Sequence, residues 1–177
     1  MERAPRVSEP ADSLEVPRDR SSCPHPAGPI VVGTDGSAPA RQAVTFALRE
    51  AQLRGTGLRA VCAYEYTPTQ HSGFERTVDS GPIPQQRDLV TQAVADSVEE
   101  LQQQLGGPSV EVEIVCERGR PAQVLLEASK DASLLVVGSR GSGAWGRLTL
   151  GSTSTEVVHH AGLPVVVVPA EHGTARS

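Results

Sequence analysis

The residues best suited to chemistry form a glycine-rich pattern late in the chain. Two residues separate Gly138 from Gly141, and after nine more residues Gly151 and Ser152 follow. Glycine lets the backbone approach a ligand closely and adopt positive φ angles. A helix beginning at Ser152 would point its unpaired first amides, at the positive end of its dipole, toward the same place. The pattern therefore predicts a cradle for an anion such as phosphate.

Hydroxyl side chains around this pattern add hydrogen-bond donors. They are Ser139, Ser142, Ser152 and Ser154. A G-x-x-G pair alone is also typical of a flexible loop, so it does not by itself indicate a ligand. The Gly-Ser pair at the helix start, and a second glycine-rich turn earlier in the chain, favour the anion site.

That second turn follows the first apolar run, Ile30 to Val32, which predicts a buried strand. The turn reads Gly33-Thr34-Asp35-Gly36-Ser37. Asp35 is its one carboxylate. Asp35 either accepts hydrogen bonds from a nucleoside or simply stabilises the turn, and the residues alone leave both open.

Hydrophobic periodicity predicts strands alternating with helices over residues 29–170. The predicted strands are 30–32, 58–64, 110–116, 134–137 and 165–168, and the helices are 38–54, a stripe over 89–105, a short helix from Pro121, and 152–160. In the last helix, Thr153 and Glu156 have capping-box spacing. Strand 110–116 alternates apolar and acidic residues, which indicates an edge strand with one wet face.

One crevice lined by both glycine-rich turns requires strands 30–32 and 134–137 to be neighbours. In open α/β sheets, ligands bind at the carboxyl ends of strands, where the strand order reverses. This favours the order 3-2-1-4-5 over the flavodoxin-like 2-1-3-4-5, and it also places strand 110–116 at an edge. We therefore expect one α/β domain, Rossmann-like, with a doubly wound five-stranded parallel sheet and helices on both faces.

Four separate segments resemble the universal stress protein family. The motif G-x2-G-x9-G-[S/T] is matched without a gap at the glycine-rich pattern above. The other three segments are residues 30–37, Gly119-Arg120-Pro121-Ala122, and the closing residues 164–169. Family members that lack the motif form a branch that does not bind ATP, so its presence favours the ATP-binding branch.

The resemblance implies ATP in the crevice, with Mg²⁺ carried on its phosphates. Asp35 would lie near the adenosine, the segment around Val61 and Cys62 would line the adenine pocket, and the start of the last helix would hold the β and γ phosphates. Arg140 occupies a variable position, where phosphate contact and solvation are equally open. The implied site residues are Gly33, Thr34, Asp35, Val61, Gly138, Ser139, Arg140, Gly141, Gly151, Ser152, Thr153 and Ser154.

The sequence does not predict a fast enzyme. It has no P-loop, and its only lysine, Lys130, falls on the predicted third helix, away from the site. We expect a nucleotide-sensing regulatory module in the stress response, acting on an unidentified protein partner. The alternatives are a slow ATPase or autokinase phosphorylating Ser152 or Ser154, and a nucleotide-free dimer scaffold.

Amino-acid composition indicates which other partners the protein is expected to bind. The 16 basic and 21 acidic residues leave a net charge of −5 without basic clusters, which argues against nucleic-acid binding. The absence of a long apolar run or secretory signal predicts a cytoplasmic protein without a membrane segment. The apolar edge strand 165–168 invites pairing with its own copy, and the family resemblance points to such a homodimer.

Several features have less specific interpretations. Residues 1–28, rich in proline, predict a disordered N-terminal tail, and residues 171–177 form a C-terminal tail. The 67–86 connection is a lid or an insertion. Cys62 and Cys116 fall on adjacent predicted strands, where we interpret them as small hydrophobes rather than a redox pair. His159 and His160 fit a helix C-terminus better than a metal site. Trp145 either covers the ligand or anchors its loop.

Overall fold

The computed structural model describes residues 28–64, 83–139 and 150–170. The predicted tails, apart from Gly28, lie outside these residues, as does the connection up to residue 82. Arg140, Gly141, Ser142 and Trp145 also lie outside them.

The described residues alternate strands with helices throughout. The strands are β1 (Ile30–Gly33), β2 (Leu58–Tyr64), β3 (Val112–Arg118), β4 (Leu134–Gly138) and β5 (Val165–Val168). The helices are α1 (Ala38–Arg54), α2 (Ile83–Leu105), α3 (Pro121–Ala128) and α4 (Ser152–His160).

All neighbouring strands pair in parallel, in the order β3-β2-β1-β4-β5. Ile30 lies between Leu58 of β2 and Leu134 of β4, which fixes the register at the centre of the sheet. The predicted strand order and the edge position of β3 are thus confirmed.

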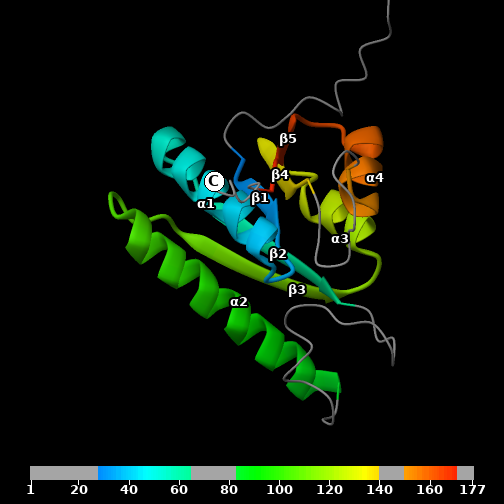
Figure 1. The fold of residues 1–177 in the computed structure, drawn as a ribbon, viewed down its shortest axis with the longest axis horizontal. Coiled ribbons are helices and arrows are strands. Elements are labelled where there is room, and N and C mark those ends of the chain that lie inside the picture. The colour runs from blue at the N-terminus through cyan, green and yellow to red at the C-terminus, as the bar shows by residue number, and fades with distance from the viewer. Residues whose placement is uncertain (1–27, 65–82, 140–149, 171–177) are drawn as a thin grey trace, which may run out of the picture.

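Helices cover both faces of the sheet, α1 and α2 on one and α3 and α4 on the other (Figure 1). Alternate residues of the central strands belong to two hydrophobic cores, one on each face of the sheet. Ile30 and Val32 face α1 and α2, and Val31 faces α3 and α4. Residues 134–137 of β4 are all buried, as their continuous apolar run predicted.

Helix α1 is bounded by local signals. The Ser37 side chain accepts a hydrogen bond from the Ala40 amide at 3.3 Å, which caps the first turn. At the other end Gly55 adopts a left-handed φ of 62°, and its N–H reaches the carbonyls of Ala51 and Gln52. The bounds of this helix match those predicted.

Helix α2 begins earlier and β3 later than predicted. Pro84 looks like a helix breaker in the sequence, but here it lies in the first turn of α2, where its missing N–H costs nothing. At β3, the N–H of Val110 donates to the Gln102 side chain at 3.1 Å, so Val110 precedes the strand. The strand therefore runs from Val112 to Arg118, two residues beyond the predicted range.

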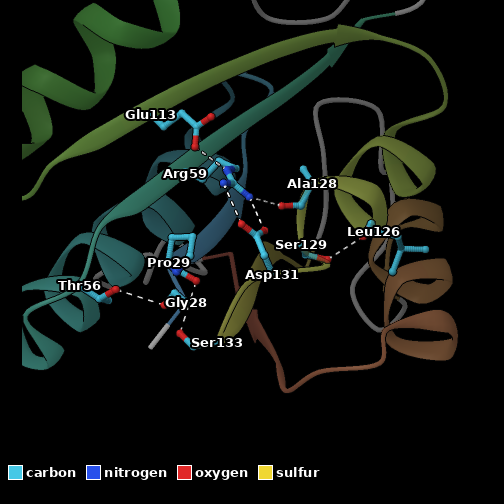
Figure 2. Close-up of polar contacts among 10 residues, drawn as sticks. All are labelled: Gly28, Pro29, Thr56, Arg59, Glu113, Leu126, Ala128, Ser129, Asp131 and Ser133. Carbon is cyan, nitrogen blue, oxygen red and sulfur yellow. Dashed lines mark hydrogen bonds and ion pairs between the residues drawn. The ribbon is translucent and has the colours of Figure 1, made fainter. Parts of the chain in front are cut away.

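A polar network closes the amino edge of the sheet (Figure 2). Arg59 on β2 donates to Glu113 at 2.6 Å, to Asp131 at 2.7 Å and to the Ala128 carbonyl at 2.7 Å. The hydrogen bond to Asp131, then that to Glu113, raises the pKa of Arg59 above its ordinary value. Lys130 belongs to the turn after α3 rather than to the helix, a correction to the sequence prediction.

Candidate functional site

The two glycine-rich turns leave the same edge of the sheet from adjacent strands. β1 and β4 pair in parallel, with Val32 opposite Val136, so both strands end side by side. The start of the turn at Gly33 and the end of β4 at Gly138 therefore lie on neighbouring strands, as the expected crevice requires. The strand order reverses between these two strands.

The turn after β1 is held by its own side chains. The Thr34 amide donates to the Val61 carbonyl at 2.9 Å, which fixes the turn against β2. The Gly36 amide donates to the Thr34 hydroxyl at 3.3 Å, with Gly36 at a φ of 73°. One oxygen of Asp35 accepts from the Ser37 amide at 3.0 Å. Asp35 thus stabilises the turn, which was one of its two interpretations.

Gly33 has a packing role that the sequence did not reveal. A Cβ atom at this position would lie 3.1 Å from both terminal carbons of Leu125 on α3. The missing side chain therefore lets α3 pack closely against the end of β1. Nothing in the local sequence signals this contact, because the two residues are far apart in the chain.

Backbone and side-chain hydrogen bonds attach the start of α4 to the end of β4. The Gly151 amide donates to the Ser139 carbonyl at 2.8 Å, and the Ser154 hydroxyl donates to the Gly138 carbonyl at 2.6 Å. The Ser139 amide donates to Val168 on β5 at 2.7 Å. These bonds hold the first turn of α4 at the carboxyl edge of the sheet, against the end of β4.

The N-cap of α4 is Gly151, and the predicted capping box is wrong. The first helical hydrogen bond runs from the Thr155 amide to the Gly151 carbonyl at 2.9 Å. Glu156 does not reach back to the helix start; it forms an ion pair with Arg120 at 3.2 Å. Since glycine has no side chain, its position provides no oxygen to accept from the first amides of α4.

The predicted hydroxyl donors have different surroundings. Ser154 is only 3% exposed, and its proton is committed to the Gly138 carbonyl. Ser139 uses its hydroxyl oxygen to accept from the Ala170 amide at 3.1 Å. Ser152 is exposed and Thr153 half-buried at the helix start. Ser152 is therefore the more accessible of the two serines considered for phosphorylation.

The Arg120–Glu156 ion pair connects α3 to α4, and the sequence analysis missed it. Arg120 is the N-cap residue of α3, in the Gly119-Arg120-Pro121 segment. The two residues are 36 positions apart, so no local pattern could show the contact. The partly exposed pair links the outer sides of the two helices that cover this face of the sheet.

Neither a metal site nor a membrane-spanning helix is found among the described residues. Within them, no group of three or more His, Cys, Asp or Glu side chains is arranged to hold a metal ion. No helix in the described ranges is long and apolar enough to cross a membrane.

The fold defines a doubly wound α/β protein whose strand order reverses between β1 and β4, the place where open sheets of this class bind ligands. The chain belongs to the universal stress protein family, whose model matches residues 27–169. The family resemblance of the sequence motifs is thus confirmed.

Mycobacterial proteins are among the similar curated sequences. A universal stress protein of Mycobacterium tuberculosis is 37% identical over 145 residues, which are 80% of this chain and 48% of that protein. One of Mycolicibacterium smegmatis is 38% identical over 151 residues, 82% of this chain and 49% of that protein. The chain thus spans about half the length of the curated relatives it matches.

Solved structures of the family share the fold. The universal stress protein UspA of Lactobacillus plantarum has a TM-score of 0.62 at 23% identity, covering 80% of this chain and 97% of its own. A universal stress protein in complex with cAMP has a TM-score of 0.56 at 25% identity, covering 80% and 96%. One from Archaeoglobus fulgidus in complex with dAMP has a TM-score of 0.54 at 20% identity, covering 80% and 97%.

Proposed function

We propose that the chain binds an adenine nucleotide in the crevice between the ends of β1 and β4, and that this nucleotide is ATP with Mg²⁺ on its phosphates. In this proposal the protein is a nucleotide-sensing module of the stress response rather than a fast enzyme. The observation that carries it is the attachment of the α4 start to the end of β4, described above.

The first turn of α4 is the proposed phosphate site. The amides of residues 152–154 precede the first helical hydrogen bond, which begins at Thr155. They lie at the positive end of the helix dipole, and a glycine N-cap leaves room for an anion in place of a capping side chain. These features fit a polyphosphate, with the Ser152 and Thr153 hydroxyls as further donors.

The turn after β1 is the proposed nucleoside site. The Ser37 amide occupies one Asp35 oxygen, and a carboxylate can accept several hydrogen bonds at once. Asp35 would accept from the ribose hydroxyls, and Gly33, Thr34 and Val61 would position the adenosine. Gly138, Ser139, Arg140 and Gly141 complete the proposed site on the other strand.

A homologous complex supports the choice of an adenine ligand. The universal stress protein solved with cAMP is 25% identical in sequence to this chain, and the structural alignment covers 96% of that protein. The proposal of a triphosphate in this chain rests on the glycine motif that continues to the start of α4.

A regulator must present different surfaces in its bound and free states, because a ligand shifts an equilibrium only by binding one state better.

We also propose that the chain acts on a protein partner and that it forms a homodimer. The dimer would form through β5, an edge strand whose four valines are all half-buried in the single chain.

Nucleotide content of the purified protein tests the proposal. The protein is denatured, the supernatant is analysed by anion exchange, and the stripped protein is titrated with ATP and Mg²⁺ by calorimetry. We expect bound or titratable ATP, with binding lost in Gly141→Val. No binding by a folded chain would contradict the proposal. Rapid phosphate release in the same mixture would contradict the non-enzymatic role.

A further inference from the structure

Two buried cysteines lie directly opposite each other on neighbouring strands. Cys62 of β2 and Cys116 of β3 are partners in the parallel register. Both belong to the apolar layer that faces α1 and α2, so their side chains lie on the same face of the sheet. They are 4% and 2% exposed, and both are free thiols.

The strand geometry suits a bond between the two sulfur atoms. Adjacent strands lie about 4.8 Å apart, and the Cα atoms of a disulfide are about 4.4 to 6.8 Å apart. A disulfide between opposed residues of β2 and β3 thus requires no sliding of one strand past the other.

The surroundings give the two thiols different acidities. A hydrogen bond from the Cys62 thiol lowers the pKa of Cys116; burial opposes this, and the positive charge of Arg87 on α2 adds to it. The same hydrogen bond raises the pKa of Cys62, helped by burial and by the negative charge of Asp35. The nearby positive charge of Arg87 makes Cys116 the better nucleophile of the two.

We propose that Cys62 and Cys116, which the sequence alone favoured as small hydrophobes, are a redox-active dithiol that a hydroperoxide converts to a disulfide between β2 and β3. The proposal does not depend on nucleotide binding. The pair does lie beside the proposed nucleoside pocket, because Cys62 directly follows Val61, whose carbonyl holds the turn after β1.

The reaction proceeds in two steps. The Cys116 thiolate attacks one peroxide oxygen, a sulfur–oxygen bond forms as the oxygen–oxygen bond breaks, and the departing oxygen takes up a proton. Cys62 then loses its proton and attacks the sulfur of the Cys116 sulfenic acid. The sulfur–sulfur bond forms as the sulfur–oxygen bond breaks and water leaves. Overall, two thiols lose two electrons to one peroxide.

The test uses the full chain with Cys23→Ser, because Cys23 is the one other cysteine and lies outside the described residues. The folded protein is treated with hydrogen peroxide, the smallest hydroperoxide, then denatured, alkylated and digested for mass spectrometry. We expect one linked peptide pair containing Cys62 and Cys116 within a single chain, reversed by dithiothreitol.

Single variants separate a nucleophile from a resolving thiol. With Cys62→Ser added, dimedone should trap a sulfenic acid at Cys116. With Cys116→Ser instead, dimedone should label Cys62 at about one tenth of that rate or more slowly still. Both thiols remaining free in folded, treated protein would overturn the proposal. So would a disulfide formed only between chains, or oxidation to sulfinic acid without a linked peptide.

Discussion

Asp35 has a role in the turn and a proposed role in ligand binding, and one substitution can separate the two. Its carboxylate accepts from the Ser37 amide and so holds the turn after β1, while the proposed function also requires its charge to accept from a nucleoside. An asparagine side chain keeps an oxygen for the amide and removes the charge. The turn and the ligand therefore respond differently to Asp35→Asn.

We predict that Asp35→Asn leaves the urea midpoint of unfolding nearly unchanged but weakens ATP binding about tenfold or more, since charge-assisted hydrogen bonds are the stronger ones. Calorimetric titration measures the affinity. Asp96→Asn removes an exposed carboxylate from α2 and serves as the matched control, which should bind like the parent chain. Equal ATP affinities of the two variants would show that the Asp35 carboxylate does not contact the nucleotide.

A second residue-scale prediction concerns the thiolate of Cys116. Arg87→Gln removes a positive charge that lowers the pKa of Cys116, so the thiolate fraction at neutral pH falls. Peroxide oxidation should then be slower at pH 7, and the difference should shrink as the pH rises above the thiol pKa. Arg49→Gln removes an exposed charge on α1 as the control. An unchanged rate for Arg87→Gln would contradict this charge effect.

Elements of the fold are fixed partly by local signals and partly by distant contacts. Helix α1 and strand β2 have their predicted bounds, because Ser37, Gly55 and apolar periodicity all act within a few residues. The shifted start of β3 depends on Gln102, which lies in another element. The same holds for Glu156, whose sequence spacing suggested a cap but whose partner is on α3.

The C-cap of α1 supplies a test of a local signal. Gly55 has a positive φ and open space around it, so Gly55→Ala should cost about 1 kcal/mol through backbone strain alone. Gly57→Ala is the control: its φ is not in the left-handed region and its new Cβ would lie 3.5 Å from the Glu111 carbonyl, an ordinary contact. The two urea midpoints should differ accordingly. Equal stabilities would contradict the cap assignment.

The Arg59 network supplies a test of a distant contact. Arg59→Met keeps the apolar stem but removes hydrogen bonds to β3, to the turn before β4 and to α3, so we expect a loss of about 1 to 3 kcal/mol. Lys130→Met breaks an exposed ion pair with Glu127 and should change stability by about 0.5 kcal/mol or less. A similar small effect for both would show that the network contributes little.

For the whole molecule, the sequence predicted the strand order because two independent signals required it. The glycine-rich turns had to be neighbours, and the acidic alternation of β3 had to face water; of the orders 3-2-1-4-5 and 2-1-3-4-5, only the first satisfies both. For the candidate site, the sequence indicates which strand ends to consider but not the contacts that form there. Packing of Leu125 against Gly33, and the hydroxyl bond of Ser154, join residues far apart in the chain.

Assembly is the prediction that belongs to this scale. The relatives are about twice as long as the segment they share with this chain, and β5 is the apolar one of the two edge strands in the described sheet. We expect sedimentation to give twice the mass of the 18.6 kDa chain at micromolar concentration. A monomer would contradict pairing through β5.

The most direct test of phosphate binding at the start of α4 compares two nearly isosteric caps. Gly151→Asp and Gly151→Asn both offer a side-chain oxygen to the first amides and should keep the helix stable, because both are good N-cap residues. Only aspartate places a negative charge where the phosphates would lie.

Stripped parent, Gly151→Asn and Gly151→Asp chains are titrated with ATP and Mg²⁺. We predict weaker binding in the asparagine variant and a further loss of about tenfold or more in the aspartate variant, with all three folded. Equal ATP affinity in all three chains would show that the first turn of α4 does not hold the phosphates.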